Sequence, residues 1–328
     1  MAELSNQLMA VTVVAYLVAM VCYAAEYAFG DKSHIGRAAT RPARQLVGAG
    51  APAVAEPPVA EPPVVAVVEE APRRDRGAQL GRAGVVVNWL AFALHLGTVV
   101  TRGIAADRMP WGNMYEFILA VTLVGSAVWL GVLTRKPGVR HLGLFAALAL
   151  VVLLGAAGLV AYTPVGPLVP ALNSYWYIIH VSTIILSSGI LLVGAVPAAM
   201  FLVRSGYDRG KRSFPYTLGA KAPAAATLER LTFRMHAFAF PLFTFGALIA
   251  GPLWAEASWG RYWGWDPKEV WAFISWIVYA CYLHARATPS VKRTVATWIA
   301  LLGFATMLMN LFGVNLFFEG LHSYANAG

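Results

Sequence analysis

The chain has 328 residues, of which 59% are apolar and only 12% are charged, and its mean hydropathy is +0.62. A soluble domain carries about twice that charged fraction, so the composition excludes a disordered protein and disfavours a soluble enzyme. The net charge is +9 at pH 7. Because the basic residues fall between apolar stretches and not in one patch, we expect no nucleic-acid partner. The composition predicts a polytopic integral membrane protein.

Eight apolar stretches are long enough to cross a bilayer, since a helical span needs about 20 residues. They predict an all-α bundle of about eight transmembrane helices, at residues 8–29, 84–101, 115–134, 142–161, 178–203, 236–254, 269–287 and 294–314. The first stretch has no basic residue before it and no clear cleavage site. We therefore expect a retained helix and not a signal peptide.

The basic residues also set the expected orientation. If the N-terminus lies outside, the inner side holds 21 of the 25 Lys and Arg residues, and the outer side holds Arg102, Arg108, Arg261 and Lys268. This asymmetry predicts an outer N-terminus and, after eight spans, an outer C-terminus. With no targeting peptide in view, we expect the bacterial plasma membrane, and a plastid thylakoid membrane is the alternative.

The chain divides into three expected parts. Residues 1–29 form the first transmembrane helix, and residues 30–82 contain the repeat Ala-Pro-Ala-Val-Ala-Glu-Pro-Pro-Val-Ala-Glu-Pro-Pro. This proline density forbids a helix, so we expect a disordered Pro/Ala-rich cytoplasmic linker, or a polyproline ligand for a partner domain. Residues 83–328 form the transmembrane core. Cys22 and Cys281 form no Cys-x-x-Cys motif, which excludes a thiol-exchange centre within the chain.

Six of the eleven Trp residues fall within residues 254–276. An aromatic belt at a membrane surface would need only about two or three such rings. Glycines between the rings allow close approach to a flat ligand, and indole faces stack on π-systems. The segment predicts a shelf for a planar molecule, either haem or a quinone headgroup. The expected shelf residues are Trp254, Trp259, Gly260, Tyr262, Trp263, Gly264, Trp265, Asp266, Pro267 and Trp271.

The run Trp-Gly-Arg-Tyr-Trp-Gly-Trp-Asp-Pro-Lys-Glu that ends at Glu269 resembles the tryptophan-rich WWD signature of haem-handling proteins. Within these proteins the chain is similar to the CcsA (ResC) branch of system II cytochrome c biogenesis. Further likeness lies in Pro110-Trp-Gly-Asn-Met-Tyr-Glu116, Tyr282-Leu-His284-Ala-Arg286 and Gly320-Leu-His322-Ser. The resemblance covers roughly residues 85–328 and implies an outer WWD segment at residues 254–271.

The resemblance implies a cytochrome c haem lyase (synthetase) subunit that carries haem across the membrane. It would present haem b on the outer side to the Cys-x-x-Cys-His of apocytochrome c, where two thioether bonds form. Implied partners are a CcsB/ResB-type membrane protein, apocytochrome c and a thiol-reducing protein. The alternatives are a haem exporter without covalent attachment and a dihaem b-type subunit that oxidises quinol. Asp266 and Glu269 have no nucleophile–base set nearby, so we expect no catalytic side chain.

Histidines within a membrane are costly unless they are used. His180 begins the fifth expected span and His322 follows the eighth, so both can reach the layer of the shelf. Imidazoles on opposite faces of one haem would give six-coordinate iron. The family resemblance implies that His180 and His322 are the two outer axial ligands.

His284 lies 15 residues past Glu269 on the same expected helix, which places it about 22 Å deeper. On the residues alone it either binds a second haem or bonds a neighbouring helix. The resemblance implies a second, inner haem site, with the other histidine supplied by the CcsB/ResB-type partner. A pair with His236 within the chain is an alternative. Arg286 either pairs with a haem propionate or simply follows the positive-inside rule.

The remaining histidines carry simpler expectations. We expect His95 to bond a backbone carbonyl within the second span, and His34 and His141 to be solvated in inner loops. The motif at residues 111–115 has two possible interpretations. It either caps and anchors the third span or forms a wall of the outer haem pocket. Its residues are Trp111, Asn113 and Tyr115.

Overall fold

The computed structural model describes residues 1–29 and 76–322, and this part consists of helices and loops without a β-strand. The expected all-α fold is confirmed. The long helices are α1 (Ala2–Phe29), α3 (Arg76–Ala106), α4 (Met114–Arg135), α5 (Gly143–Val160), α6 (Tyr175–Asp208), α7 (Ala225–Phe245), α9 (Pro267–Ala287) and α10 (Arg293–Leu308). The shorter segments are η2 (Pro137–Leu142), η3 (Pro170–Leu172), η4 (Tyr216–Lys221), η5 (Gly246–Ala250), α8 (Gly251–Trp259), η6 (Met309–Gly313) and α11 (Val314–Phe317).

Helix α3 begins earlier than the sequence predicts. Residues 76–82, expected to end the linker, form its first turns, and α3 extends past the expected span 84–101 at both ends. The last proline before this helix is Pro72, so no proline prevents a helical start at Arg76. Residues 30–75, with the proline-rich repeat and His34, lie outside the described residues.

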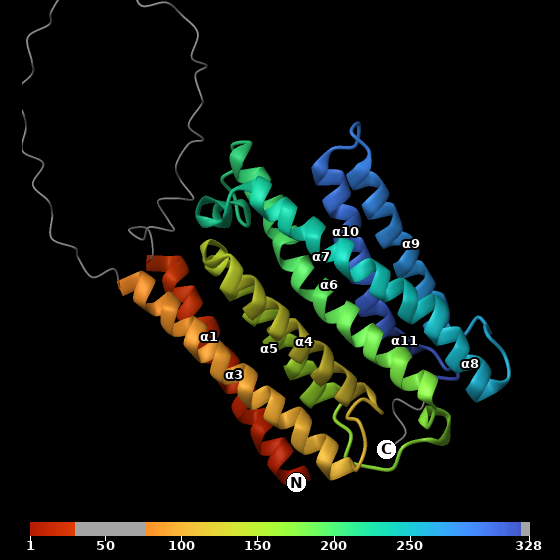
Figure 1. Ribbon diagram of the computed structural model, residues 1–328. Helices are drawn as coiled ribbons and strands as arrows, with labels where there is room; N and C mark the ends of the chain where they lie inside the picture. The colour runs from red at the N-terminus through yellow and green to blue at the C-terminus, as the bar shows by residue number, and fades with distance from the viewer. Residues whose placement is uncertain (30–75, 323–328) are drawn as a thin grey trace, which may run out of the picture.

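Seven helical segments of the described chain are long and apolar enough to cross a membrane. The eighth expected span, 269–287, does form α9, but charged residues near the ends of this helix, including Lys268 and Arg286, lower its apolar character. In Figure 1 α9 runs beside α10, which agrees with about eight crossings. The seven segments are α1, α3, α4, α6, Pro137–Val160, Ala225–Trp259 and Arg293–Phe317.

Helix α6 lies at the centre of the bundle, between α4 and α5 on one side and α7 and α10 on the other (Figure 1). Its most apolar window is 83% buried, the highest share of the seven candidate spans. Small residues allow this close packing. A Cβ atom on Gly189 would lie 2.6 Å from Val124 of α4, and one on Gly194 would lie 3.0 Å from His236 of α7.

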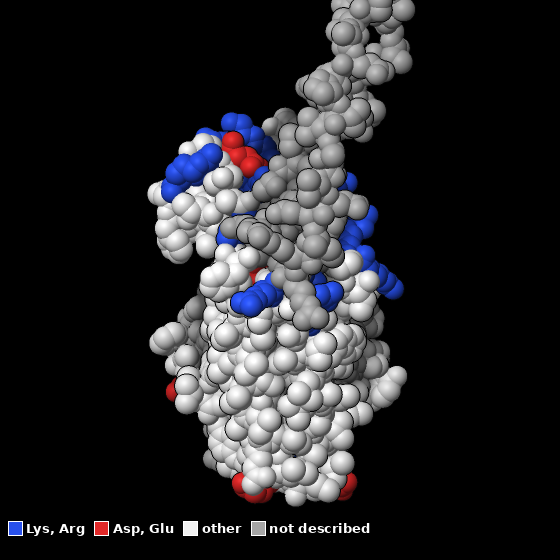
Figure 2. Space-filling view, turned by 90° about the vertical axis from the view of Figure 1, so that its left-hand side faces the viewer, with Lys and Arg blue, Asp and Glu red and all other residues white. Residues whose placement is uncertain are grey.

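The two ends of the bundle differ in charge. We call the end with Trp254 and Trp259 of α8 the tryptophan end, and the opposite end the basic end. α1 begins and α11 ends at the tryptophan end (Figure 1). Figure 2 shows a broad band with almost no charged side chains, between basic residues at the basic end and a few acidic residues at the tryptophan end. Such a band suits a surface that faces lipid.

Buried arginine–glutamate contacts hold the first helices together at both ends. At the basic end, Arg140 of η2 donates from Nε to both oxygens of Glu26 of α1, at 3.0 and 2.9 Å. At the tryptophan end, Glu116 of α4 lies 3.0 Å from Arg102 and 2.7 Å from Arg108. Both carboxylates are fully buried, so each depends on its arginine partners for compensation.

Two buried histidines belong to this part of the bundle. His141 is only 4% exposed, and its ring packs edge-on against Tyr27 of α1. The expectation of a solvated loop histidine is therefore wrong, because its segment folds as η2 against α1. His95 is fully buried, and its Nδ1 lies 3.4 Å from the hydroxyl of Tyr16 in α1. Its partner is therefore a tyrosine and not the expected backbone carbonyl, since its Nε2 makes no hydrogen bond within the described residues.

Replacing Glu26 by Ala leaves the guanidinium of Arg140 buried without its carboxylate. We expect the free energy of unfolding to fall by about 3–5 kcal/mol. Asp208→Ala is the matched control, because the side chain of Asp208 is 44% exposed in its pair with Arg204, and exposed pairs contribute about 0–1 kcal/mol. Thermal unfolding in detergent micelles measures both variants. Equal shifts would contradict the role of the buried pair.

Candidate functional site

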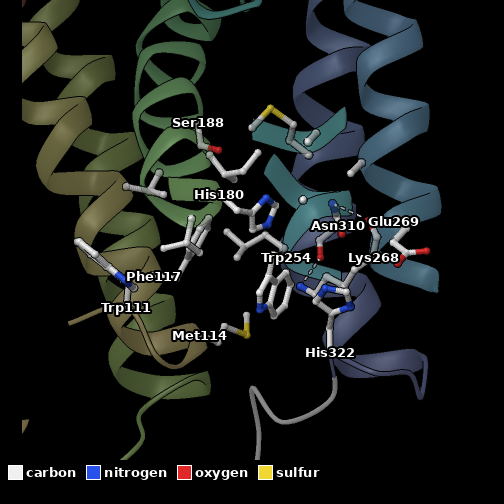
Figure 3. Close-up of a pocket in the computed structure, with 18 of the residues that line it drawn as sticks. Trp111, Met114, Phe117, His180, Ser188, Trp254, Lys268, Glu269, Asn310 and His322 are labelled. Atoms are coloured by element: carbon white, nitrogen blue, oxygen red, sulfur yellow. Dashed lines mark hydrogen bonds between the residues drawn. The ribbon is translucent and has the colours of Figure 1, made fainter. Parts of the chain in front are cut away.

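A cavity of about 230 Å³ lies at the tryptophan end, lined by side chains from α4, α6, α8, α9 and α10 (Figure 3). Half of the residues predicted for the site line it. These are Trp111, Asn113, His180, Trp254, Trp259, Tyr262, Trp263 and His322. Apolar and polar residues that were not among the predicted site residues complete the wall. They include Met114, Phe117, Ser188, Lys268, Glu269 and Asn310.

His180 stands in the second turn of α6 and is fixed on two sides. Its Nδ1–H donates to the carbonyl of Gly246 at 2.8 Å, where α7 passes into the π-helical segment η5. Its ring stacks on Trp254 of α8, with centroids 5.5 Å apart and planes at 17°. Gly251 allows this approach, because a Cβ there would lie 3.1 Å from the histidine ring. The imidazole is therefore held in one orientation.

His322 reaches the same cavity from the end of the described chain. Its Nδ1 donates to the carboxylate of Asp266 at 2.7 Å, and the backbone N–H of Leu321 donates to the other oxygen at 2.6 Å. Its ring lies 5.4 Å from Trp254 and 5.2 Å from Trp259, edge-on to both. These contacts fix the segment after α11 against Asp266 and the two tryptophans of α8.

Asp266 connects these contacts to the start of α9. It is the N-cap, accepting from the backbone of Lys268 at 3.1 Å, and Glu269 completes a capping box. The helix begins at Pro267, two residues before the expected span 269–287. Burial raises the pKa of Asp266, but the hydrogen bond and charge of His322, with the backbone donors, bring this pKa below its ordinary value. The group is therefore a carboxylate at neutral pH.

The loop with Trp111 is tied to α6 and α8. Tyr177 donates from its hydroxyl to the carbonyl of Trp111 at 2.6 Å and packs 5.3 Å from Trp254. Trp254 donates from Nε1 to the carbonyl of Ala171 at 2.9 Å. Asn113 accepts from the backbone of Glu116 and caps α4, so the capping interpretation is confirmed while the side chain also lines the cavity.

Several residues predicted for the shelf or for the pocket wall do not line the cavity. Trp265 is 70% exposed at a positive φ of 59°. Tyr115 is buried beneath the guanidinium of Arg102, with its ring edge-on to that of Tyr162. Five other predicted residues shape the backbone of this segment or pack outside the cavity. Gly260, Gly264, Asp266, Pro267 and Trp271 belong to this group.

Gly260 and Gly264 keep a structural reason for being glycine. Gly260 ends α8 with φ at +69°, a conformation that favours glycine, and its N–H donates to Glu256. A Cβ on Gly264 would collide with the Arg261 side chain, and its N–H donates to the Glu269 carboxylate at 2.8 Å. Both residues therefore shape the loop that carries Tyr262 and Trp263.

The histidines near the basic end do not form a pair. His236 is buried, donates from Nδ1 to Thr232 at 2.8 Å, and packs 4.8 Å from the ring of Tyr282. His284 lies on the exposed face of α9, since Tyr282 and Ala285 occupy the buried face. The geometry argues against a site made by His236 and His284 within the chain.

Arg286 has a partner of its own. Its guanidinium binds the carboxylate of Glu229 in α7 and lies 4.8 Å from the ring centroid of Phe233. Arg286 therefore joins α9 to α7 through this ion pair, which argues against its expected role as the partner of a haem propionate.

The donor set at the tryptophan end suits a metalloporphyrin. In each of His180 and His322, Nδ1–H donates to an oxygen, so the lone pair of the neutral imidazole, which can bind a metal, is on Nε2. A histidine whose second nitrogen is fixed by a carboxylate or a carbonyl is the usual arrangement in metal sites. Apolar and aromatic walls surround both rings. Fold and cavity together define a multi-pass helical membrane protein with a histidine- and tryptophan-lined pocket.

Comparison with known proteins agrees with this class. Residues 111–322 match the model of a family described as cytochrome C assembly protein. The cytochrome c biogenesis protein CcsA of Guillardia theta is 35% identical over 268 residues, covering 75% of this chain and 85% of that protein. CcsA of Gloeobacter violaceus is 31% identical over 294 residues, covering 75% and 87%. The chain belongs to the cytochrome c assembly family, in its CcsA-type branch.

A solved structure shares the fold. The cytochrome c haem lyase CcmF matches with a TM-score of 0.59 and 20% identity, covering 95% of this chain and 46% of that chain. At this identity the likeness concerns the arrangement of helices. The family match spans the tryptophan segment and all three proposed ligand histidines, His180, His284 and His322, and it leaves α1 and α3 outside.

Asp266→Ala should loosen the segment at Leu321 and His322, because both the N-cap of α9 and the acceptor for His322 are lost. We expect a stability loss of about 1–2 kcal/mol from the cap alone and faster amide exchange at Leu321. Asp266→Asn keeps a capping oxygen and should lose less stability. Hydrogen exchange and thermal unfolding compare both variants with Glu256→Ala, an exposed carboxylate of α8. Unchanged exchange at Leu321 in Asp266→Ala would contradict the fixing of this segment by Asp266.

Proposed function

We propose that this chain is the haem-presenting subunit of a cytochrome c haem lyase. It carries haem b across the membrane and presents it at the tryptophan end to the Cys-x-x-Cys-His of apocytochrome c. The observation that carries the proposal is the convergence of His180 and His322 on Trp254 within one cavity. Haem is here the substrate, and its vinyl groups supply the carbons that form the two thioether bonds.

In this proposal the chain holds and orients the substrate and performs no bond chemistry of its own. His180 and His322 supply two imidazole nitrogens for the iron, and Trp254, Trp259 and Trp263 supply flat faces for the porphyrin. The hydrogen bonds to Gly246 and Asp266 preset both imidazoles, which lowers the ordering cost of binding. Position, ligation and exclusion of water are then the contribution of the protein.

We place a second, inner haem site at His284. Its exposure on α9 supports ligation together with a histidine from a CcsB/ResB-type partner, because the ring faces away from the bundle. The tryptophan end then lies on the outer side of a bacterial plasma membrane, with both termini outside. A thiol-reducing protein would keep the apocytochrome cysteines reduced.

Two other functions are alternatives to this proposal. A haem exporter would use the same cavity but yield no covalent product. A dihaem b-type subunit that oxidises quinol would hold ligand pairs within the bundle helices. The ligands proposed here lie at the start of α6 and beyond α11, and His236 is packed against tyrosines, which favours presentation over electron transfer.

Changing His180 or His322 to Ala should lower holocytochrome c at least about tenfold in cells that depend on this chain, as each removes one ligand from a two-ligand site. The purified complex should also lose the sharp low-spin α-band of its reduced spectrum, and a pyridine haemochrome assay gives the haem content. His236→Gln, a buried change outside the cavity, is the folding control. An unchanged level of holocytochrome c in both alanine variants would contradict the proposal.

His284→Ala separates the two proposed sites. We expect the complex with the CcsB/ResB-type partner to lose part of its haem, while haem held by His180 and His322 in detergent keeps its low-spin spectrum when added directly. Arg293→Ala, at the start of α10 near the same end, is the control for surface changes. A full haem content in His284→Ala would contradict the inner site without touching the outer one.

A further inference from the structure

Lys268 is placed unusually for a cation of a membrane protein. It is the second residue of α9, and its side chain lines the cavity at the tryptophan end together with His322 and Trp263 (Figure 3). Among the described residues that line this cavity, it is the only Lys or Arg. The cavity is otherwise aromatic, apolar or neutral around the two imidazoles, apart from Glu269.

The ammonium group is held in place by a backbone oxygen. Its Nζ donates to the carbonyl of Asn310 in η6 at 3.0 Å, and the side-chain amide of Asn310 donates back to the carbonyl of Lys268 at 3.4 Å. This reciprocal contact joins the start of α9 to the π-helical segment of the neighbouring helix. An ammonium has three N–H donors, so one carbonyl leaves capacity for a further acceptor.

The two carboxylates next to Lys268 in sequence are committed elsewhere. Asp266 accepts from His322, Leu321 and the backbone of Lys268. Glu269 accepts from the backbone N–H groups of Gly264 and Asp266 at 2.8 and 3.1 Å. No ion pair joins either group, or any other carboxylate of the described chain, to the Lys268 ammonium.

A cation in a sheltered cavity is costly without a counter-charge. The arginines of the bundle avoid this cost, because Arg102, Arg108 and Arg140 each face a buried glutamate. Lys268 differs from them in having a neutral carbonyl as its partner. The charge of Asp266 acts on the ammonium from a distance without forming an ion pair, so the ammonium can still accept a carboxylate from a molecule that fills the cavity.

We infer that Lys268 binds a carboxylate of the ligand that enters this cavity. The inference rests on the proposed function, under which that carboxylate is a propionate of haem. Lys268 then acts as a positioning and specificity residue: it fixes which edge of the porphyrin lies against α9 and η6, and so leaves the opposite, vinyl-bearing edge for the incoming cysteines. It also selects dicarboxylate porphyrins against neutral ones.

The test compares haem with haem dimethyl ester, in which both carboxylates are blocked. The full-length chain in detergent is titrated with each compound, and binding is followed by the Soret band. For the unmodified chain we expect about tenfold tighter binding of haem than of the ester, the size of one charge-assisted hydrogen bond. In Lys268→Met the ratio of the two affinities should be about tenfold lower than in the unmodified chain, with ester binding unchanged.

Two further variants keep the result interpretable. Lys268→Arg retains a cation and should retain a preference for haem, which separates loss of charge from loss of the Asn310 contact. Arg261→Met removes a cation of the same segment that does not line the cavity, and it should keep the full preference. The stronger partition of the ester into micelles is the same for every variant, so it cancels when the ratio of the two affinities is compared between variants.

The outcomes separate the inference from the proposed function. A full preference for haem in Lys268→Met, or none in the unmodified chain, overturns the role of Lys268 while haem binding itself stands. If the unmodified chain binds neither compound, the proposed function fails and the inference falls with it. Should Lys268→Met not fold, Lys268→Gln carries the same test, because it removes the charge but keeps an N–H donor.

Discussion

The geometry at the tryptophan end depends on one carboxylate. Asp266 begins α9 as its N-cap, accepts from the backbone at Leu321 and orients the ring of His322. Because one carboxylate makes all three contacts, the start of α9, the backbone at Leu321 and the ring of His322 cannot move independently. Glu269 completes the capping box by accepting from the backbone of Asp266. The start of α9 and the segment at Leu321 and His322 are therefore held together at one corner of the cavity.

Two departures from regular helix geometry complete this corner. The π-helical segment η5 presents the carbonyl of Gly246 to His180, and η6 presents the carbonyl of Asn310 to Lys268. Single π-turns within α-helices occur frequently at functional sites, because the wider turn displaces the backbone. In this chain both place a main-chain oxygen against a polar side chain of the cavity, so the helices themselves serve as supporting partners.

The sequence predicted the bundle well because apolar length is a strong signal, and it correctly placed His180, His322 and Trp254 in one layer. It missed the contacts between residues that are far apart in the sequence and meet only when the chain folds. The link between Asp266 and His322 joins residues 56 apart, and no local pattern encodes it. The burial of His141 likewise depends on α1 packing over η2, which spacing along the chain does not reveal.

Charge compensation distinguishes the structural part of the bundle from its site. Where helices only need to be held, a buried arginine meets a buried glutamate, as Arg140 meets Glu26. At the cavity Asp266 holds the ring of His322, while the ammonium of Lys268 has only a carbonyl partner. Under the proposed function, in which a charged, planar substrate is accepted and later released, this asymmetry favours binding. A resident carboxylate on Lys268 would stabilise the empty cavity and so weaken the binding of any ligand carboxylate.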